Sequence, residues 1–170
     1  MTLAATRLAV PSPALRLALA VLPVLATALT GPLFTTPNIP TWYAGLAKPG
    51  FTPPNWMFPV AWSMLYAMIA LACWRVLGKA PASADLRRGR SVALAAYAVQ
   101  LALNAIWTPV FFAAHSLLGG LVVIVALLVM ILWTIRLFWP LDRAAALLLV
   151  PYAGWVAFAT AVNAAVWRMN

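Results

Sequence analysis

The sequence predicts an all-α integral membrane protein, a bundle of five transmembrane helices. Of its 170 residues, 66% are hydrophobic, and Asp85 and Asp142 are the only acids. The apolar residues form five long runs, each close to or above the roughly 20 residues that a helix needs to cross a bilayer. These runs cover about 15–34, 57–77, 91–112, 117–138 and 145–167. They leave a short N-terminal tail, 1–14, and one membrane domain, 15–170.

The runs are predicted to be helices rather than strands of a barrel. Backbone polar groups inside a bilayer must be satisfied within the protein, which leaves helices or a closed barrel. Barrel strands alternate over roughly 10 residues, whereas these runs are continuous. The charged residues nearest to them fall at their ends: Arg16, Arg75, Arg136 and Arg168.

The basic residues predict the orientation of the bundle. With five spans, the N-terminal side holds nine of the eleven: Arg7, Arg16, Arg75, Lys79, Arg87, Arg88, Arg90, Arg136 and Arg143. The other side holds Lys48 and Arg168. Positive residues gather on the cytoplasmic side, so we expect a cytoplasmic N-terminus in a bacterial inner membrane, with the outer membrane as the alternative. The basic excess then reflects topology and attraction to anionic lipid. No basic patch alternates with aromatic residues on a soluble face, so nucleic-acid binding is not expected.

The first run could instead belong to a signal peptide. Arg7 and Arg16 precede its apolar core, and residues 26–28 (Ala-Thr-Ala) resemble a weak cleavage site. We expect the run to be retained, because its removal would leave four spans and weaken the charge asymmetry.

The connection 35–56 is predicted to be a stiff aromatic lid at the membrane interface. Its prolines at 37, 40, 49, 53 and 54 restrict the backbone against helix and sheet. Its aromatic residues are Trp42, Tyr43, Phe51 and Trp56. An ordinary interfacial belt of aromatic residues is the alternative. The sequence contains no convincing internal repeat, which disfavours the inverted-repeat transporters.

Aromatic and amide side chains share one face in each of three predicted helices. In the second, third and fifth runs these are Trp62 and Tyr66; Gln100, Asn104 and Trp107; and Tyr152, Trp155, Ala159 and Asn163. Amides in a bilayer need partners, so they should face the interior of the bundle. Taken singly, each amide is more typical of a bond between helices. Together with the aromatic rings they outline an apolar cavity with few polar groups, which is typical of a small-molecule site.

The opposite face of the third predicted helix carries small residues. They are Ala95, Ala98, Ala102 and Ala105, about 180° from the amides. Small residues at this spacing let helices approach closely. We therefore expect contact with another helix or with a second subunit in a homodimer.

The usual catalytic and metal-binding groups are missing from the sequence. Cys73 is the single cysteine, which excludes an intrachain disulfide and a cysteine cluster. His115 is the single histidine and lies in a short loop without a second ligand, so we interpret it as an ordinary interfacial residue rather than a haem ligand. There is no catalytic triad, carboxylate pair or phosphate-binding loop. We expect no metal site and no required cofactor.

Three segments resemble the TspO/MBR family of tryptophan-rich sensory and translocator proteins. They are WYAGLAKPGFTPPNWMFPVAWSMLY (42–66), QLALNAIWTPVFF (100–112) and VPYAGWVAFATAVNAAVWR (150–168). The resemblance covers about residues 42–168. It implies a five-helix bundle, usually a homodimer, that binds tetrapyrroles such as porphyrin and haem, sterols and benzodiazepine-type compounds.

Residue matching implies the positions of the family's pocket. Trp62 and Trp155 match its tryptophans, Asn104 its asparagine, and Ala159 a position associated with ligand and sterol affinity. The lid positions match Trp42, Tyr43, Lys48 and Pro49. The predicted ligand-binding set is Trp42, Phe51, Phe58, Trp62, Tyr66, Gln100, Asn104, Trp107, Trp155 and Ala159. The family's proposed sterol motif is incomplete, because Val162 and Arg168 match it but Ala164 replaces its tyrosine.

Three functions follow from the resemblance. The leading hypothesis is a membrane binding protein or sensor for tetrapyrroles and similar apolar ligands. The alternatives are an enzyme that degrades porphyrin in light, with Trp62 and Trp155 as its working residues, and a passive translocator of porphyrin or sterol.

Overall fold

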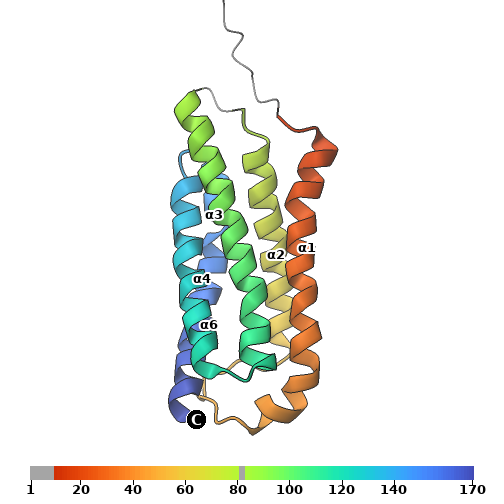
Figure 1. Cartoon of the computed structure of the whole chain (residues 1–170), viewed down its shortest axis with the longest axis vertical. Helices are drawn as coiled ribbons and strands as arrows, with labels where there is room; N and C mark the ends of the chain where they lie inside the picture. The colour runs from red at the N-terminus through yellow and green to blue at the C-terminus, as the bar shows by residue number, and fades with distance from the viewer. Residues whose placement is uncertain (1–9, 81–82) are drawn as a thin grey trace, which may run out of the picture.

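The computed structural model describes residues 10–80 and 83–170 as a bundle of long, nearly parallel helices (Figure 1). Five segments are long and apolar enough to span a membrane, so the predicted fold class is confirmed. In chain order the elements are α1 Pro13–Asn38, the π-helix η1 Ile39–Tyr43, α2 Met57–Leu77, α3 Ala84–Thr108, the π-helix η2 Pro109–Ala113, α4 Leu117–Phe138, α5 Arg143–Leu148 and α6 Val150–Met169. Arg7 and most of the predicted tail lie outside the described residues.

Helix caps account for two boundaries that differ from the sequence prediction. The third span begins at Ala84 rather than at residue 91, because the Ser83 hydroxyl accepts a hydrogen bond from the Leu86 N–H at 3.2 Å. A serine at this position satisfies a donor that the first turn would otherwise leave free. The fifth span begins at Arg143 in the same way, with Asp142 as its cap.

The prediction that prolines exclude helix from residue 35 onward is wrong. The helix of α1 passes Pro32 and Pro37 and continues as η1 to Tyr43. Proline is tolerated in membrane helices where side chains and local π turns satisfy the backbone groups that it disturbs. Here Thr35 donates to the Gly31 carbonyl at 3.0 Å, and η1 supplies a wider turn. The irregular part of the lid is therefore residues 46–56, which we call the capping segment.

The two ends of the bundle differ in composition. One end, which we call the basic end, holds the start of α1, the connection from α2 to α3 and the turn from α4 to α5, and lies at the top of Figure 1. The other, the capping end, holds η1, the capping segment, η2 and the C-terminus, and lies at the bottom.

The half of the bundle next to the basic end is tightly packed. Alanines with no exposed surface lie on four helices there: Ala20, Ala72, Ala93, Ala145 and Ala146. Small side chains let helix axes approach closely. Larger residues fill the remaining space, and the Tyr97 ring stacks on Phe138 with centroids 6.1 Å apart.

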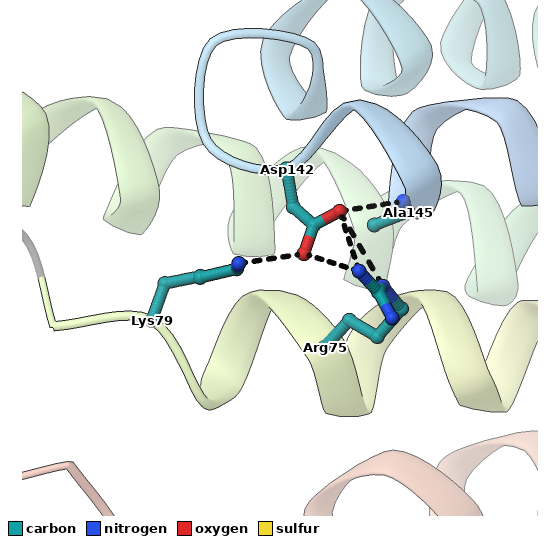
Figure 2. A network of polar contacts seen from close by, with 4 residues as sticks. All are labelled: Arg75, Lys79, Asp142 and Ala145. Atoms are coloured by element: carbon teal, nitrogen blue, oxygen red, sulfur yellow. Dashed lines mark hydrogen bonds and ion pairs between the residues drawn. The ribbon is translucent and has the colours of Figure 1, made fainter.

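One buried carboxylate fastens the basic end (Figure 2). Asp142 accepts the Ala145 N–H at 3.0 Å and lies 3.1 Å from the charged nitrogens of both Arg75 and Lys79. Burial by itself would raise the pKa of this carboxyl. The hydrogen bonds from Ala145, Lys79 and Arg75, with the charge of Arg75, outweigh that effect and hold its pKa below the ordinary value. The network therefore joins the end of α2 to the turn between α4 and α5.

The two faces of α3 have the environments that the sequence predicts. Gln100 and Asn104 are buried, whereas Ala95, Ala98 and Ala102 are exposed. Ala105, the last member of the alanine stripe, is half-buried. Within this chain, the alanine face is thus left open toward the membrane.

Candidate functional site

A cavity of about 520 Å³ occupies the half of the bundle next to the capping end. Every long helix contributes to its wall, but none contributes along its full length. The deepest lining residue of each helix, counted from the capping end, is Ala28, Tyr66, Asn104, Leu127 or Trp155. The cavity therefore ends near the middle of the bundle, where the packed half begins.

Nine aromatic residues line the cavity. Trp62 stacks on Tyr66 with centroids 5.1 Å apart, four residues along α2. Trp155 on α6 meets the edge of Phe58 on α2 at 5.9 Å and 78°. Stacked and edge-to-face contacts are the preferred arrangements of aromatic pairs. The rings therefore hold one another in place and present flat apolar surfaces to the cavity.

Two tyrosines and one amide close the deep end of the cavity, the end farthest from the capping segment, which we call its floor. The Tyr66 hydroxyl donates to Asn104 Oδ1 at 3.3 Å, and Asn104 Nδ2 donates to the Tyr152 hydroxyl at 2.8 Å. Asn104 is 6% exposed, so these bonds satisfy an amide that the membrane interior would otherwise strand. At most one N–H of Asn104 remains for a ligand.

The second amide of the cavity is also bound within the bundle. Asn163 Oδ1 accepts the Trp107 indole N–H at 3.3 Å, and Asn163 Nδ2 donates to the Leu117 carbonyl at 3.1 Å. Gly120 makes room for this contact, because a Cβ there would lie 2.7 Å from Phe111 and 3.2 Å from Asn163 Oδ1. The bonds fix the orientation of the Trp107 ring in the wall.

The mouth of the cavity faces the membrane between α1 and α2. Five lining residues are exposed, and they lie on these two helices and on the adjoining end of the capping segment: Pro32, Thr36, Asn55, Pro59 and Ser63. An apolar molecule dissolved in the bilayer would therefore meet the opening directly.

The cavity is polar only through uncharged groups. Among the described residues, none that lines it is Asp, Glu, Lys, Arg or His. Three of its hydroxyls donate to the protein: Tyr66 to Asn104, Ser63 to the Pro59 carbonyl and Thr35 to the Gly31 carbonyl. Their lone pairs are left as acceptors. This arrangement favours an apolar ligand that carries hydrogen-bond donors.

The capping segment is held by bonds to distant parts of the chain. The Asn170 side chain accepts the Ala47 N–H at 3.0 Å and donates to the Ala47 carbonyl at 3.1 Å. Phe51 lies edge-on to Phe158 with centroids 6.4 Å apart. The Lys48 ammonium lies 4.7 Å from the centre of the Tyr43 ring. These contacts fasten the segment over one end of the cavity.

Comparison with known proteins identifies the family of this chain. The sequence profile of the TspO/MBR family matches residues 19–168. The chain belongs to the TspO/MBR family. It is 46% identical to protein CrtK of Rhodobacter capsulatus over 129 residues, which cover 76% of this chain and 78% of that protein.

Relatives from two other lineages match over similar lengths. The chain is 40% identical to the tryptophan-rich protein TspO of Archaeoglobus fulgidus over 156 residues, 92% of this chain and 97% of that protein. It is 36% identical to the human translocator protein over 132 residues, 76% of this chain and 75% of that protein. These relatives support membership of a membrane family of sensors and translocators.

The structure brings most of the predicted site residues of this TspO/MBR chain together. Seven of them line the cavity: Phe58, Trp62, Tyr66, Asn104, Trp107, Trp155 and Ala159. Three of them do not. Trp42 stacks on His115 at 4.4 Å beyond the capping end of the cavity, and Phe51 is 54% exposed. Gln100 is buried one turn deeper than Asn104, below the floor, and neither of its amide atoms has a protein partner.

Sequence reasoning missed the contribution of α1 to the site. Five residues of α1 line the cavity, and Ile39 of η1 continues the same face: Ala28, Gly31, Pro32, Thr35, Thr36 and Ile39. Four of them, Ala28, Gly31, Thr35 and Ile39, recur at intervals of three, four and four, which is one helical face. Small and polar residues at that spacing in a leucine-rich segment were the available signal.

Proposed function

We propose that this TspO/MBR chain is a membrane binding protein or sensor whose cavity takes a flat, largely apolar ligand of the tetrapyrrole class. The observation that carries the proposal is the wall formed by Trp62, Tyr66 and Trp155 around one cavity of about 520 Å³. Small-molecule sites span roughly 300–1,000 Å³ and are lined mainly by apolar and aromatic groups. Flat indole faces suit a flat macrocycle better than a flexible chain.

The polar groups of the cavity support the same ligand class. The Tyr66 hydroxyl donates to Asn104 and so offers its lone pairs to the cavity. A pyrrole N–H could donate to it. The remaining N–H of Asn104 would serve a carbonyl, which leaves a small number of directional bonds to orient the ring.

The charged substituents of such a ligand would lie where the mouth adjoins the capping segment. Burial of a carboxylate without a partner is strongly unfavourable, and no charged side chain among the described residues lines the cavity. The two cations at the capping end of the chain are Lys48 and Arg168. We therefore expect propionates to point toward the interface at that end, while the macrocycle enters the cavity.

The placement of the protein in its membrane is also a proposal. We propose an inner membrane with the basic end in the cytoplasm, since nine of the eleven basic residues belong to that side. We further propose a homodimer through the exposed alanine face of α3, because exposed small residues at helical spacing favour close helix contact.

Absorbance and tryptophan fluorescence of the purified protein with protoporphyrin, in darkness and in light, test the function. The expected result is quenched tryptophan fluorescence with an unchanged amount of porphyrin in both conditions. Light-dependent conversion of the porphyrin to a defined product, found only with the protein present, would replace the sensor with a degrading enzyme. Absence of quenching in darkness would contradict tetrapyrrole binding altogether.

A further inference from the structure

A second hollow lies at the basic end, at the opposite end of the bundle from the cavity. It is open to solvent on one side and is lined by Arg75 and Lys79 at the end of α2 and by residues 139–144 between α4 and α5. We call it the basic hollow. The polar cavity floor and the packed core of the bundle separate it from the tetrapyrrole site, so the two can be tested independently.

The positive charges around the basic hollow exceed the negative ones. Arg75 and Lys79 lie on either side of the Asp142 carboxylate and share its single charge (Figure 2). Arg143 adds a third cation, whose guanidinium lies 5.9 Å from the centre of the Trp139 ring. Asp85 is the only other acid in the chain and is exposed on the first turn of α3, outside the hollow. The lining of the basic hollow therefore carries three cations and one carboxylate.

Donors remain available after the carboxylate is satisfied. Arg75 uses Nε and Nη2 on Asp142, which leaves Nη1. An ammonium has three N–H groups, and Lys79 has one contact with the carboxylate. The side chains of Arg75 and Lys79 are 37% and 51% exposed, so a ligand can reach them. Arginine forks and lysine ammonium groups together are the usual donors to phosphate.

The position of the hollow in the bundle indicates the source of that phosphate. It lies where the membrane-spanning α2 and α4 end and the last span begins. Trp139 on its rim is 42% exposed, and exposed tryptophans at the ends of spans lie at headgroup level. Basic pockets between membrane helices at this depth suit phospholipid head groups.

We propose that the basic hollow binds the phosphate of an anionic phospholipid, with Arg75, Lys79 and Arg143 as its donors. Arg143 is the informative residue, because it lines the hollow but makes no bond with Asp142. Its replacement by glutamine removes one cation and leaves the network that fastens α2 in place.

Native mass spectrometry of the full chain, titrated with phosphatidylglycerol and with phosphatidylcholine of the same acyl chains, tests the proposal. We expect the first phosphatidylglycerol to bind at least about fivefold more tightly than phosphatidylcholine. R143Q should weaken phosphatidylglycerol binding about fivefold, the effect of one basic residue near an anionic surface. R88Q is the matched control, because Arg88 is exposed near the same end on α3 and does not line the hollow. It should change the affinity by less than about twofold.

Two results would overturn the site. An equal loss of phosphatidylglycerol affinity in R143Q and R88Q would mean that the overall charge of this end, and not the basic hollow, causes the lipid preference. Equal affinities for phosphatidylglycerol and phosphatidylcholine would mean that there is no such preference. A thermal-shift series with inorganic phosphate at constant ionic strength tests whether the basic hollow takes a free phosphate instead of a lipid. An Arg143-dependent rise in melting temperature without selective lipid binding would replace the lipid with a free phosphate. Unchanged dark protoporphyrin binding by R143Q shows that the variant is folded.

Discussion

The two halves of the bundle use side-chain size in opposite ways. Next to the basic end, fully buried alanines such as Ala72 and Ala145 let the helices approach, and little space remains between them. Next to the capping end, large rings such as Trp62 and Trp155 stand around a cavity. The larger side chains thus enclose the larger space.

The difference in polarity follows the difference in packing. The basic end holds ion pairs that join helix ends, whereas the cavity holds only neutral hydrogen bonds between tyrosine, asparagine, tryptophan and backbone groups. Ion pairs tolerate the headgroup region, but a charge at membrane depth would need a partner there. The comparison indicates that the packed half supplies stability and leaves the capping half free for ligand binding.

Replacement of a small residue by leucine should have contrasting effects in the two halves. In the packed half it should cause the largest loss of stability that we expect. Ala72 has no exposed surface, so Ala72→Leu should lower the free energy of unfolding by about 2 kcal/mol through overpacking. Ala159→Leu places the same bulk in the cavity, so it should change stability by less than about 0.5 kcal/mol and weaken porphyrin binding about tenfold. Denaturation curves and dark binding isotherms measure both. Equal destabilisation by the two variants would break the comparison.

Removal of the Asp142 charge should have the next largest effect. Asp142→Asn keeps a good helix cap but leaves Arg75 and Lys79 without their shared anion. Both cations are partly exposed, so we expect a loss of only about 1 kcal/mol near neutral pH. The folded protein lowers the pKa of this carboxyl, so its charge stabilises the fold above the unfolded pKa of about 4. That contribution is lost as the pH falls through the folded pKa.

Melting temperatures of the wild type and Asp142→Asn at several pH values check this prediction. The gap between them should be constant above about pH 5 and should narrow as the pH is lowered below 4. A gap that widens in acid would mean that the carboxyl is not held in its charged form by Arg75 and Lys79.

Substitutions on the two faces of α3 should separate ligand binding from assembly. Asn104→Ala removes the floor bonds to Tyr66 and Tyr152 and should weaken porphyrin binding about fivefold without a change in oligomeric state. Replacement of Ala98 and Ala102 by Leu should do the reverse. Isotherms and detergent-corrected masses measure the two effects. A double-leucine protein that stays dimeric but no longer binds would refute the proposed dimer face.

Release of the capping segment should have the smallest effect. Asn170→Ala removes both bonds to Ala47. We expect ligand release two- to threefold faster with an unchanged melting temperature, because the bonds are exposed and lie outside the packed half. Met169→Ala, a change at an exposed residue beside the same terminus, is the control for stopped-flow dissociation. An equal acceleration in the control would assign the effect to a loosened C-terminus rather than to the Ala47 bonds.

Regular features of the molecule could be predicted from the sequence. The bounds of α2 and α4 agree with the apolar runs 57–77 and 117–138, because each of these helices begins and ends where its apolar run does. The shared faces of Trp62 with Tyr66 and of Asn104 with Trp107 follow from helical spacing, and all four side chains line the cavity.

Features that depend on contacts across the fold could not be predicted in this way. The helical path through Pro37 depends on local side-chain bonds and on a π turn. Asn170 and Ala47 are 123 residues apart, and no pattern links them. Gln100 shares a face with Asn104, but the Tyr66–Asn104–Tyr152 bonds close the cavity before it.

The central claim is that the aromatic walls of the capping half hold the ligand, and dark binding isotherms of protoporphyrin to three tryptophan variants test it most directly. Trp133 is the control, because it is 53% exposed on α4 and does not line the cavity. Trp62→Ala and Trp155→Ala should each weaken binding about tenfold, the loss of about 1.4 kcal/mol of aromatic contact. Trp133→Ala should bind as the wild type does. Wild-type affinity in Trp62→Ala and Trp155→Ala, or an equal loss in all three, would contradict the account.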